Sequence, residues 1–322
     1  MTQAEIALEQ DAPLKGIGLL VFATAIFSVQ DVIIKLLSDS YPAHEIVFFR
    51  SLFGMLPILA IIWFEGSWRH LRTRRPLAQI VRGLLGFLAY TTFYLALAAL
   101  PLADTVTLFY AGPLFVTALA VPFLGERVGP RRWAAVLVGF LGVVVVTRPF
   151  GGNLEPAMLL AVACAVTYAV SVLITRRLAR TESGSCLAFY MMLTFLAASA
   201  VTGLAMGDGR YAVEGHPSAE FLLRGWVGPS GEDWTLLLLL GLISGTGFYC
   251  ISQAYRIASA SLVAPFEYAS LPWAILWGYL SWADIPAPTT VLGLILIAGS
   301  GLYIIHREGV RGRRLLRGRP LR

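Results

Sequence analysis

The sequence predicts an all-α membrane protein in which ten transmembrane helices form two inverted five-helix repeats, with both termini cytoplasmic. Three observations support this fold class: the composition, the number of long apolar segments and the placement of the basic residues. Of the 322 residues, 57% are hydrophobic and 14% are charged, and the mean hydropathy is +0.72. Ordinary soluble domains contain roughly 25% charged residues. The composition therefore excludes a soluble enzyme, a disordered chain and a nucleic-acid-binding protein.

Ten apolar segments approach or exceed the length of about 20 residues that a membrane-spanning helix needs. The predicted helices cover residues 14–36, 43–64, 79–100, 103–124, 132–148, 156–175, 184–205, 234–255, 261–281 and 287–306. Short breaks that contain Pro or Gly separate many of them, as at Tyr41-Pro42 and Gly129-Pro130, and such residues end helices. The long connection at about 207–233 is polar and acidic, and we expect it to form an external loop.

These segments divide the chain into two halves and two tails. Residues 1–13 form a cytoplasmic N-terminal tail, and residues 14–148 contain the first five helices. The second five helices occupy residues 156–306, which include the external loop at 207–233. Residues 307–322 form a basic cytoplasmic tail.

The basic residues gather at alternate connections, which gives the predicted orientation. They follow the second, fourth, sixth and eighth predicted helices and fill the C-terminal tail: Arg69, Arg72, Arg74, Arg75, Arg127, Arg131, Arg132, Arg176, Arg177, Arg180, Arg256 and the arginines from Arg307 to Arg322. The opposite side has only Arg148, Arg210 and Arg224. Because Lys and Arg in loops mark the cytoplasmic face, we expect a multi-pass protein of the bacterial cytoplasmic (inner) membrane. The net charge of +6 then reports topology and not a nucleic-acid partner.

The two halves of the chain resemble each other weakly. With a shift of 159 residues, Pro113 aligns with Pro272 and Gly142 with Gly301. Because five is an odd number, a second copy of five helices is inserted upside down relative to the first. Inverted repeats are a design of secondary transporters, which open alternately to the two sides of the membrane. The alternative is a duplication that only enlarged a membrane protein.

A second pattern lies between the fourth and fifth predicted helices. It runs from Gly112-Pro113 through Leu124-Gly125-Glu126-Arg127 and Pro130 to a Gly-rich helix that ends at Thr147-Arg148-Pro149. Together with the ten-helix pattern, this stretch resembles the EamA-type branch of the drug/metabolite transporter superfamily. The runs Gln30–Lys35 and Ala264–Tyr268 are similar to members that import riboflavin or take up S-adenosylmethionine.

The resemblance implies a secondary transporter of a small organic metabolite that works by alternating access. An aromatic or heterocyclic substrate, such as riboflavin or S-adenosylmethionine, is the first expectation. Export of amino acids, of other metabolites or of drugs is the alternative function. A membrane-embedded enzyme is a more distant one, because the four histidines lie scattered in loops and at helix ends.

Charged residues inside apolar spans need a reason, because each costs roughly 2.5–3.5 kcal/mol on insertion scales. Asp31 and Lys35 lie four residues apart on one helix face and could pair. Arg50 lies in the first half of the second predicted helix. Arg50 or Lys35 could bind an anionic substrate group, or the three charged residues could form a gate. A static ion-pair network is the alternative.

Glu267 lies in the first half of the ninth predicted helix, between Phe266 and Tyr268. A carboxyl group in a site of low dielectric can exchange protons near neutral pH. Glu267 could therefore carry a coupling proton or bind a cationic substrate. The alternative is a structural pair with Arg256 or Arg82.

Aromatic residues are dense in the third, fourth, eighth and ninth predicted helices, and their rings offer stacking surfaces for a planar ligand. The candidate cavity residues are Tyr90, Tyr94, Phe109, Tyr110, Tyr249, Gln253, Glu267, Tyr268, Trp273 and Trp277. Trp and Tyr also form belts at membrane interfaces, which is the alternative. Pro113 and Pro272 interrupt backbone hydrogen bonding, so they are candidate hinges, with helix packing as the alternative.

We expect no cofactor and no metal site. The cysteines Cys164, Cys186 and Cys250 fall in apolar runs and match no metal-binding spacing. The GxxxxGK[ST] phosphate-binding pattern is absent, so transport would use a gradient or exchange. The expected partners are a small-molecule substrate, a coupling proton and the lipid membrane, and the chain is expected to be a monomer or a homodimer.

Overall fold

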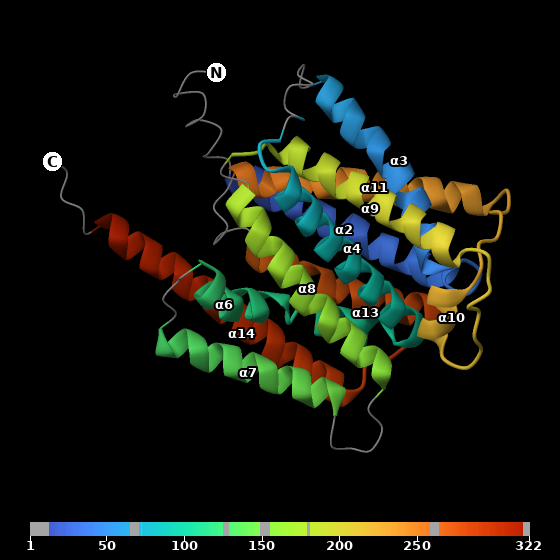
Figure 1. Cartoon of the computed structure of the whole chain (residues 1–322). Coiled ribbons are helices and arrows are strands. Elements are labelled where there is room, and N and C mark those ends of the chain that lie inside the picture. Colours follow the sequence, from blue (N-terminus) through green and yellow to red (C-terminus); the bar gives the residue numbers. More distant parts are fainter. Residues whose placement is uncertain are drawn as a thin grey trace.

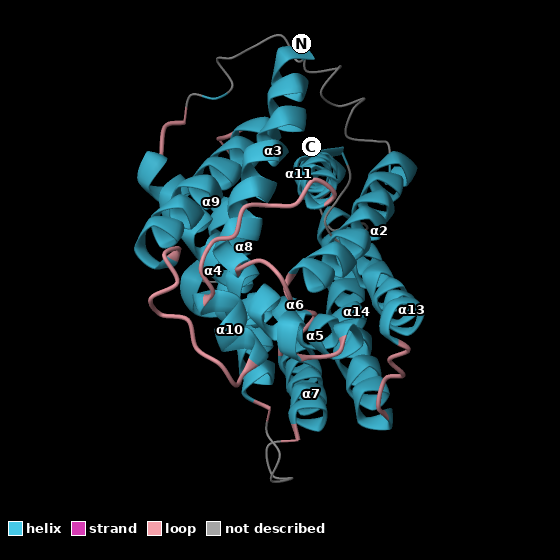
Figure 2. Cartoon of the chain, turned by 90° about the vertical axis from the view of Figure 1, so that its right-hand side faces the viewer, coloured by secondary structure: helices cyan, strands magenta, loops and turns pink. Residues whose placement is uncertain are grey.

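The computed structural model describes residues 13–64, 71, 73–124, 129–148, 155–178, 181–257 and 264–317. Its helices form a single bundle, and no strand occurs in these ranges (Figures 1 and 2). The helices are α2 (Pro13–Leu37), α3 (Ala43–Phe64), α4 (Pro76–Ala99), α5 (Leu102–Phe109), α6 (Gly112–Leu124), α7 (Pro130–Thr147), α8 (Pro156–Leu178), α9 (Gly184–Met206), α10 (Pro217–Leu223), α11 (Asp233–Ile257), the 3-10 helix η2 (Ala264–Ala269), α13 (Ser270–Trp282) and α14 (Pro288–Arg317).

Length and composition qualify seven helical segments of the described chain as membrane-spanning. They are Leu14–Leu37, Ala43–Phe64, Pro76–Ala99, Leu102–Phe123, Pro156–Thr175, Gly184–Met206 and Asp233–Ile251. Trp133–Thr147 and Pro288–Ile304 are shorter apolar helices. Large apolar side chains also cover the outside of the bundle: Trp63 is 70% exposed and Leu204 is 88% exposed. The predicted all-α membrane class is confirmed. The number of ten spans, their inversion and the cytoplasmic termini stay predictions.

The predicted helix 103–124 is interrupted. α5 ends at Phe109, and α6 begins at Gly112. Pro113 has no N–H and cannot donate to the Phe109 carbonyl, which a continuous helix would require. The backbone instead makes shorter-range bonds at the break, from Ala111 N to Leu108 O (3.1 Å) and from Leu114 N to Ala111 O (3.0 Å).

The predicted helix 261–281 is also divided. Its described part begins as η2, and α13 takes over at Ser270. Pro272 is the third residue of α13, where the N–H groups of a helix have no partner within the helix. Both repeat-matched prolines therefore stand in the first turn of the helix that follows a break.

Small residues allow the closest helix contacts. α3, α9 and α11 lie together along one side of the bundle, and α7 lies against α14 on another (Figure 1). A Cβ atom on Gly245 of α11 would overlap the Gly54 carbonyl oxygen of α3. A Cβ on Gly142 of α7 would come within 2.9 Å of the Gly293 carbonyl oxygen of α14. Without side chains at these points, the backbones can approach as they do in other membrane bundles.

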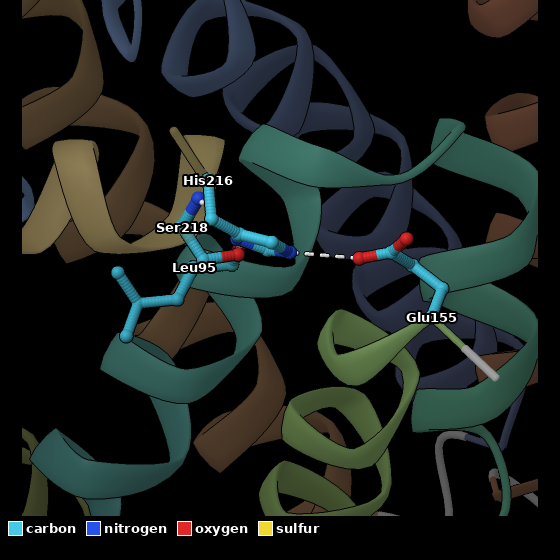
Figure 3. A network of polar contacts seen from close by, with 4 residues as sticks. All are labelled: Leu95, Glu155, His216 and Ser218. Atoms are coloured by element: carbon cyan, nitrogen blue, oxygen red, sulfur yellow. Dashed lines mark hydrogen bonds and ion pairs between the residues drawn. The ribbon is translucent and has the colours of Figure 1, made fainter. Parts of the chain in front are cut away.

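The predicted external loop at 207–233 contains helix α10. We call residues 207–232 the α10 connection. His216 caps α10 by accepting a hydrogen bond from Ser218 N (3.2 Å), and its Nε2 lies 2.8 Å from Glu155 Oε1 (Figure 3). Ser218 Oγ donates to the Leu95 carbonyl oxygen (2.6 Å) (Figure 3). The connection is therefore bonded to α4 and to the residue that precedes α8.

Further along, the α10 connection is bonded to the turn between α2 and α3 and to the first turn of α3. Arg224 Nη1 donates to the Ser38 carbonyl oxygen (2.9 Å), and Val227 N donates to Glu45 Oε2 (3.2 Å). Tyr41 Oη donates to Asp233 Oδ2 (2.5 Å) at the start of α11. The connection thus covers one end of the bundle as an ordered, hydrogen-bonded segment.

Candidate functional site

A cavity of about 110 Å³ lies near the centre of the bundle. Its walls come from α2, α4, α5, α8, α11, η2 and the first residue of α13. Six aromatic rings form much of the surface: Phe27, Tyr90, Phe93, Phe109, Tyr110 and Tyr168. The polar side chains at the wall, apart from tyrosines and carboxylates, are Thr24, Ser28, Gln30 and Ser270. An apolar, aromatic cavity with a few polar groups is the usual form of a small-molecule site.

Both helix breaks border this cavity. Tyr110 stands at the break between α5 and α6, and Ser270 stands at the junction of η2 and α13. Ser270 Oγ donates to Tyr110 Oη at 2.6 Å, and the rings of Tyr110 and Tyr268 lie 5.2 Å apart. Irregular backbone at membrane depth is tolerated where it lines a cavity or is buried in protein. The two helix breaks therefore meet at the cavity, where irregular backbone costs less free energy than it would next to lipid.

Two carboxylates reach the cavity from different halves of the sequence. Asp31 comes from α2, and Glu267 comes from η2. Both also act electrostatically on Tyr90 and Tyr110, two of the tyrosines at the wall. The structure thus brings together two residues that are 236 positions apart in the printed sequence.

Among the described contacts, no ion pair joins Asp31 and Lys35. Lys35 Nζ donates to the Leu100 carbonyl oxygen (2.5 Å) and lies 5.1 Å from the centre of the Trp282 ring. The acidic residues that act on Lys35 are Asp284, Asp39 and Asp104. Lys35 is long enough to reach the end of the bundle, whereas the short Asp31 side chain stays at the cavity.

Arg50 lies behind the cavity wall and is fully buried. Its Nε donates to Ser244 Oγ (2.6 Å), and its Nη1 donates to Tyr94 Oη. Ser244 Oγ also lies 2.6 Å from Gln30 Oε1, and Gln30 borders the cavity. The guanidinium carbon of Arg50 lies 4.8 Å from the centre of the Tyr90 ring.

The predicted cavity residues fall into three groups. Tyr90, Phe109, Tyr110 and Glu267 border the cavity. Tyr94, Tyr268 and Trp277 lie next to residues that do, because Tyr94 contacts Arg50 and Gln30, Tyr268 packs on Tyr110, and Trp277 Nε1 donates to Ser28 Oγ (3.1 Å). Tyr249, Gln253 and Trp273 are not among the residues that border it, and Gln253 Nε2 donates to Tyr249 Oη (2.7 Å).

Several wall residues escaped prediction, and one signal could have found some of them. Thr24 and Ser28 precede the predicted Asp31 at spacings of four and three residues in the apolar sequence of α2. This spacing places them on one helix face. Tyr168 and Ser270 carry no such signal, because other polar residues occur in the same helices, such as Ser171 in α8 and Ser281 in α13, and the sequence does not set the wall residues apart from them.

The family profile that matches this chain is that of the EamA-like transporter family, and it matches twice, at residues 14–148 and 155–305. Among curated relatives, the S-adenosylmethionine uptake transporter of Rickettsia felis is 28% identical over 92% of this chain and 94% of that protein. The riboflavin transporter of Rhizobium johnstonii is 30% identical over 98% of both chains. The pseudopaline exporter of Pseudomonas aeruginosa is 30% identical over 88% of this chain and 93% of that protein.

The fold also occurs among solved structures. One crystal structure superposes with a TM-score of 0.60 at 22% sequence identity, over 98% of this chain and 99% of that chain. The family match covers most of the chain, and it confirms the resemblance drawn from the residues. The chain is thus a multi-pass protein of the bacterial inner-membrane type, and it belongs to the EamA-like transporter family.

Proposed function

We propose that this transporter moves a small organic metabolite across the cytoplasmic membrane by alternating access around the central cavity. The observation that carries the proposal is the composition of the cavity wall, to which each half of the chain contributes a helix break and a carboxylate. Sites at the interface of two repeats, built from discontinuous helices, are typical of secondary transporters. Rocking one half against the other would expose such a cavity to each side in turn.

We also infer ten spans in two inverted repeats, residues 14–148 and 156–306, with residues 1–13 and 307–322 as cytoplasmic tails. The double family match supports this division. The helix contacts support it as well, because they come in pairs. α2 packs on α11 as α8 packs on α4, and α3 packs on α11 as α9 packs on α4. A two-fold relation that exchanges α2–α4 with α8, α9 and α11 gives these pairs. The positive-inside bias supports cytoplasmic tails and an external α10 connection.

The substrate class we favour is an aromatic or heterocyclic metabolite. The rings of the cavity wall support it, since they offer stacking and cation–π surfaces. The names of the S-adenosylmethionine and riboflavin relatives agree with it. The cavity of about 110 Å³ is smaller than the roughly 300 Å³ at which ligand sites usually begin. Binding such a metabolite therefore requires a state with a wider cavity, which rocking of the halves would supply.

The coupling ion we favour is a proton carried by Asp31 or Glu267. Both carboxylates border the cavity, so protonation there would alter its charge as it changes sides. Pro113 and Pro272 would act as hinges at the start of α6 and within the first turn of α13. The direction of transport has a second candidate, export, which the pseudopaline exporter relative favours.

The test is uptake into proteoliposomes that contain the purified full chain and an imposed proton gradient. Labelled riboflavin and S-adenosylmethionine are the first solutes, and liposomes loaded with solute report export. Transport by the Glu267→Gln variant should fall by about tenfold or more, because each loss of about 1.4 kcal/mol of coupling free energy corresponds to a factor of ten. The matched control is Asp208→Asn, which removes a carboxylate whose side chain is 56% exposed and paired with Arg210.

The control variant should transport both solutes at the wild-type rate. Equal expression of the two variants in the membrane separates a transport defect from a folding defect. Full transport by Glu267→Gln would remove this residue from the mechanism. Absence of transport of either solute in both directions would overturn the proposed substrate class.

A further inference from the structure

Arg50 is the largest fully buried side chain in the described part of the chain. It lies in the membrane-spanning segment Ala43–Phe64. The hydrogen bonds that it donates go to neutral hydroxyl oxygens, those of Ser244 and Tyr94. Its third nitrogen, Nη2, has no hydrogen-bond partner among the described residues. A charged group in this environment is costly and is usually retained for function.

The surroundings of Arg50 stabilise a cation but supply no carboxylate hydrogen-bonded to the guanidinium group among the described residues. Four aromatic rings, those of Tyr90, Tyr94, Phe195 and Phe248, have their centres 4.8–5.9 Å from the guanidinium carbon. Ring faces attract a cation without accepting directional N–H bonds as strongly as an oxyanion does. A guanidinium group presents a planar fork of N–H donors that fits a carboxylate.

The position of Arg50 connects it to the cavity. Tyr90, whose ring lies against the guanidinium group, borders the cavity, and so does Gln30, which contacts both Ser244 and Tyr94. Asp31 borders the cavity on the same helix as Gln30 and is close enough to interact electrostatically with Arg50. Arg50 therefore contacts Tyr90 of the cavity wall directly and Gln30 through Ser244 and Tyr94.

We propose that the transported metabolite carries a carboxylate and that Arg50 binds this group through Nη2 when the cavity widens. This inference rests on the proposed transport function and narrows its substrate class. Asp31 and Glu267 border the same cavity, so they favour a positive charge elsewhere on the bound molecule. A zwitterion therefore fits the site better than a simple anion or an uncharged heterocycle.

The test compares two molecules that differ in the carboxylate. S-adenosylmethionine has an α-carboxylate, an amine and a sulfonium group, whereas decarboxylated S-adenosylmethionine lacks only the carboxylate. Riboflavin serves as the uncharged heterocycle. We expect wild-type protein in proteoliposomes to transport S-adenosylmethionine at least about tenfold better than the decarboxylated compound, as expected for one charge-assisted hydrogen bond.

The Arg50→Gln variant should lose this preference by losing transport of the carboxylated molecule. Arg82→Gln is the matched control, because Arg82 is also a buried arginine of a membrane-spanning helix but bonds to Gln79 and Leu187 away from the cavity. The control should keep the wild-type preference. Ser244→Ala removes a hydrogen bond that orients Arg50 and keeps its charge, so it should reduce the preference severalfold even if Arg50→Gln does not fold.

Two results would overturn the inference and leave the transport function intact. One is transport of riboflavin or of the decarboxylated compound at least as fast as that of S-adenosylmethionine. The other is a folded Arg50→Gln variant with the wild-type preference. If folded wild-type protein transports none of the three solutes, the proposed substrate class fails, and the carboxylate inference fails with it.

Discussion

Arg50 on α3 and Arg82 on α4, the two arginines that are buried among the residues whose burial the structure describes, occupy different kinds of surroundings. Arg82 Nη2 donates to the Leu187 carbonyl oxygen (2.6 Å) and to Gln79 Oε1 (3.1 Å). Arg50 donates to two hydroxyl groups inside a ring of aromatic side chains. Each arginine has one buried nitrogen without a partner among the described residues, Nη2 of Arg50 and Nε of Arg82. An unpaired nitrogen therefore does not distinguish the two sites.

Their neighbours do distinguish them. Arg82 joins α4 to α9 and is packed against residues that do not border the cavity. Arg50 contacts Tyr90, which forms part of the cavity wall. Burial and charge therefore identify a residue that is costly to bury. Contact with the cavity wall then indicates whether such a residue has a structural role or a role in ligand binding.

The largest expected effect is that of Arg50→Met on transport. An apolar side chain of similar length removes the charge without leaving a large void, so we expect transport to be abolished. Arg50→Met removes two hydrogen bonds, but it also removes the desolvation cost of a buried charge, which offsets their loss. The thermal unfolding temperature in detergent should therefore stay the same or rise. Loss of transport through unfolding, seen as a lower unfolding temperature, would contradict the contrast between the two arginines.

Arg82→Met should have the opposite pattern. It removes a charge-assisted bond between α4 and α9 and should lower the free energy of unfolding by about 1.5–3 kcal/mol. Transport per folded molecule should be unchanged, because no partner of Arg82 borders the cavity. Denaturation followed by tryptophan fluorescence measures the first quantity, and uptake normalised to folded protein measures the second. A change in substrate preference would show that the two regions are coupled.

Tyr94→Phe sharpens the comparison from within the Arg50 site. The variant keeps the aromatic ring and removes the hydroxyl group that contacts Arg50 and Gln30. We expect transport to fall severalfold and the free energy of unfolding to fall by about 1 kcal/mol. Wild-type transport would mean that the orientation of Arg50 does not matter.

The smallest effect is expected for Gln79→Ala. This change removes one of the two acceptors of Arg82, and the Leu187 carbonyl oxygen remains. The free energy of unfolding should fall by about 1 kcal/mol, the net value of one ordinary hydrogen bond. Transport should stay at the wild-type level. An effect as large as that of Arg82→Met would show that the amide, and not the carbonyl, holds Arg82.

The sequence predicts the membrane class well, because long apolar segments have few other stable environments. It predicts the breaks less well, since Gly112-Pro113 and Pro272 lie in continuous apolar runs that give no sign of where one helix ends. Asp31, Arg50 and Glu267 could be singled out as charges in apolar spans. Their partners could not, because Ser244 is 194 residues from Arg50 and only tertiary packing brings them together.

The α10 connection has a kinetic consequence. Its bonds to Leu95, Ser38 and Glu45 tie the ends of several helices to one segment. If the helices separate at the end of the bundle that the α10 connection covers, these bonds break together, unless the connection moves with one group of helices. At about 1 kcal/mol each, three broken bonds would slow the separation by about two orders of magnitude. The segment would then control turnover number, while the cavity controls which molecule is carried.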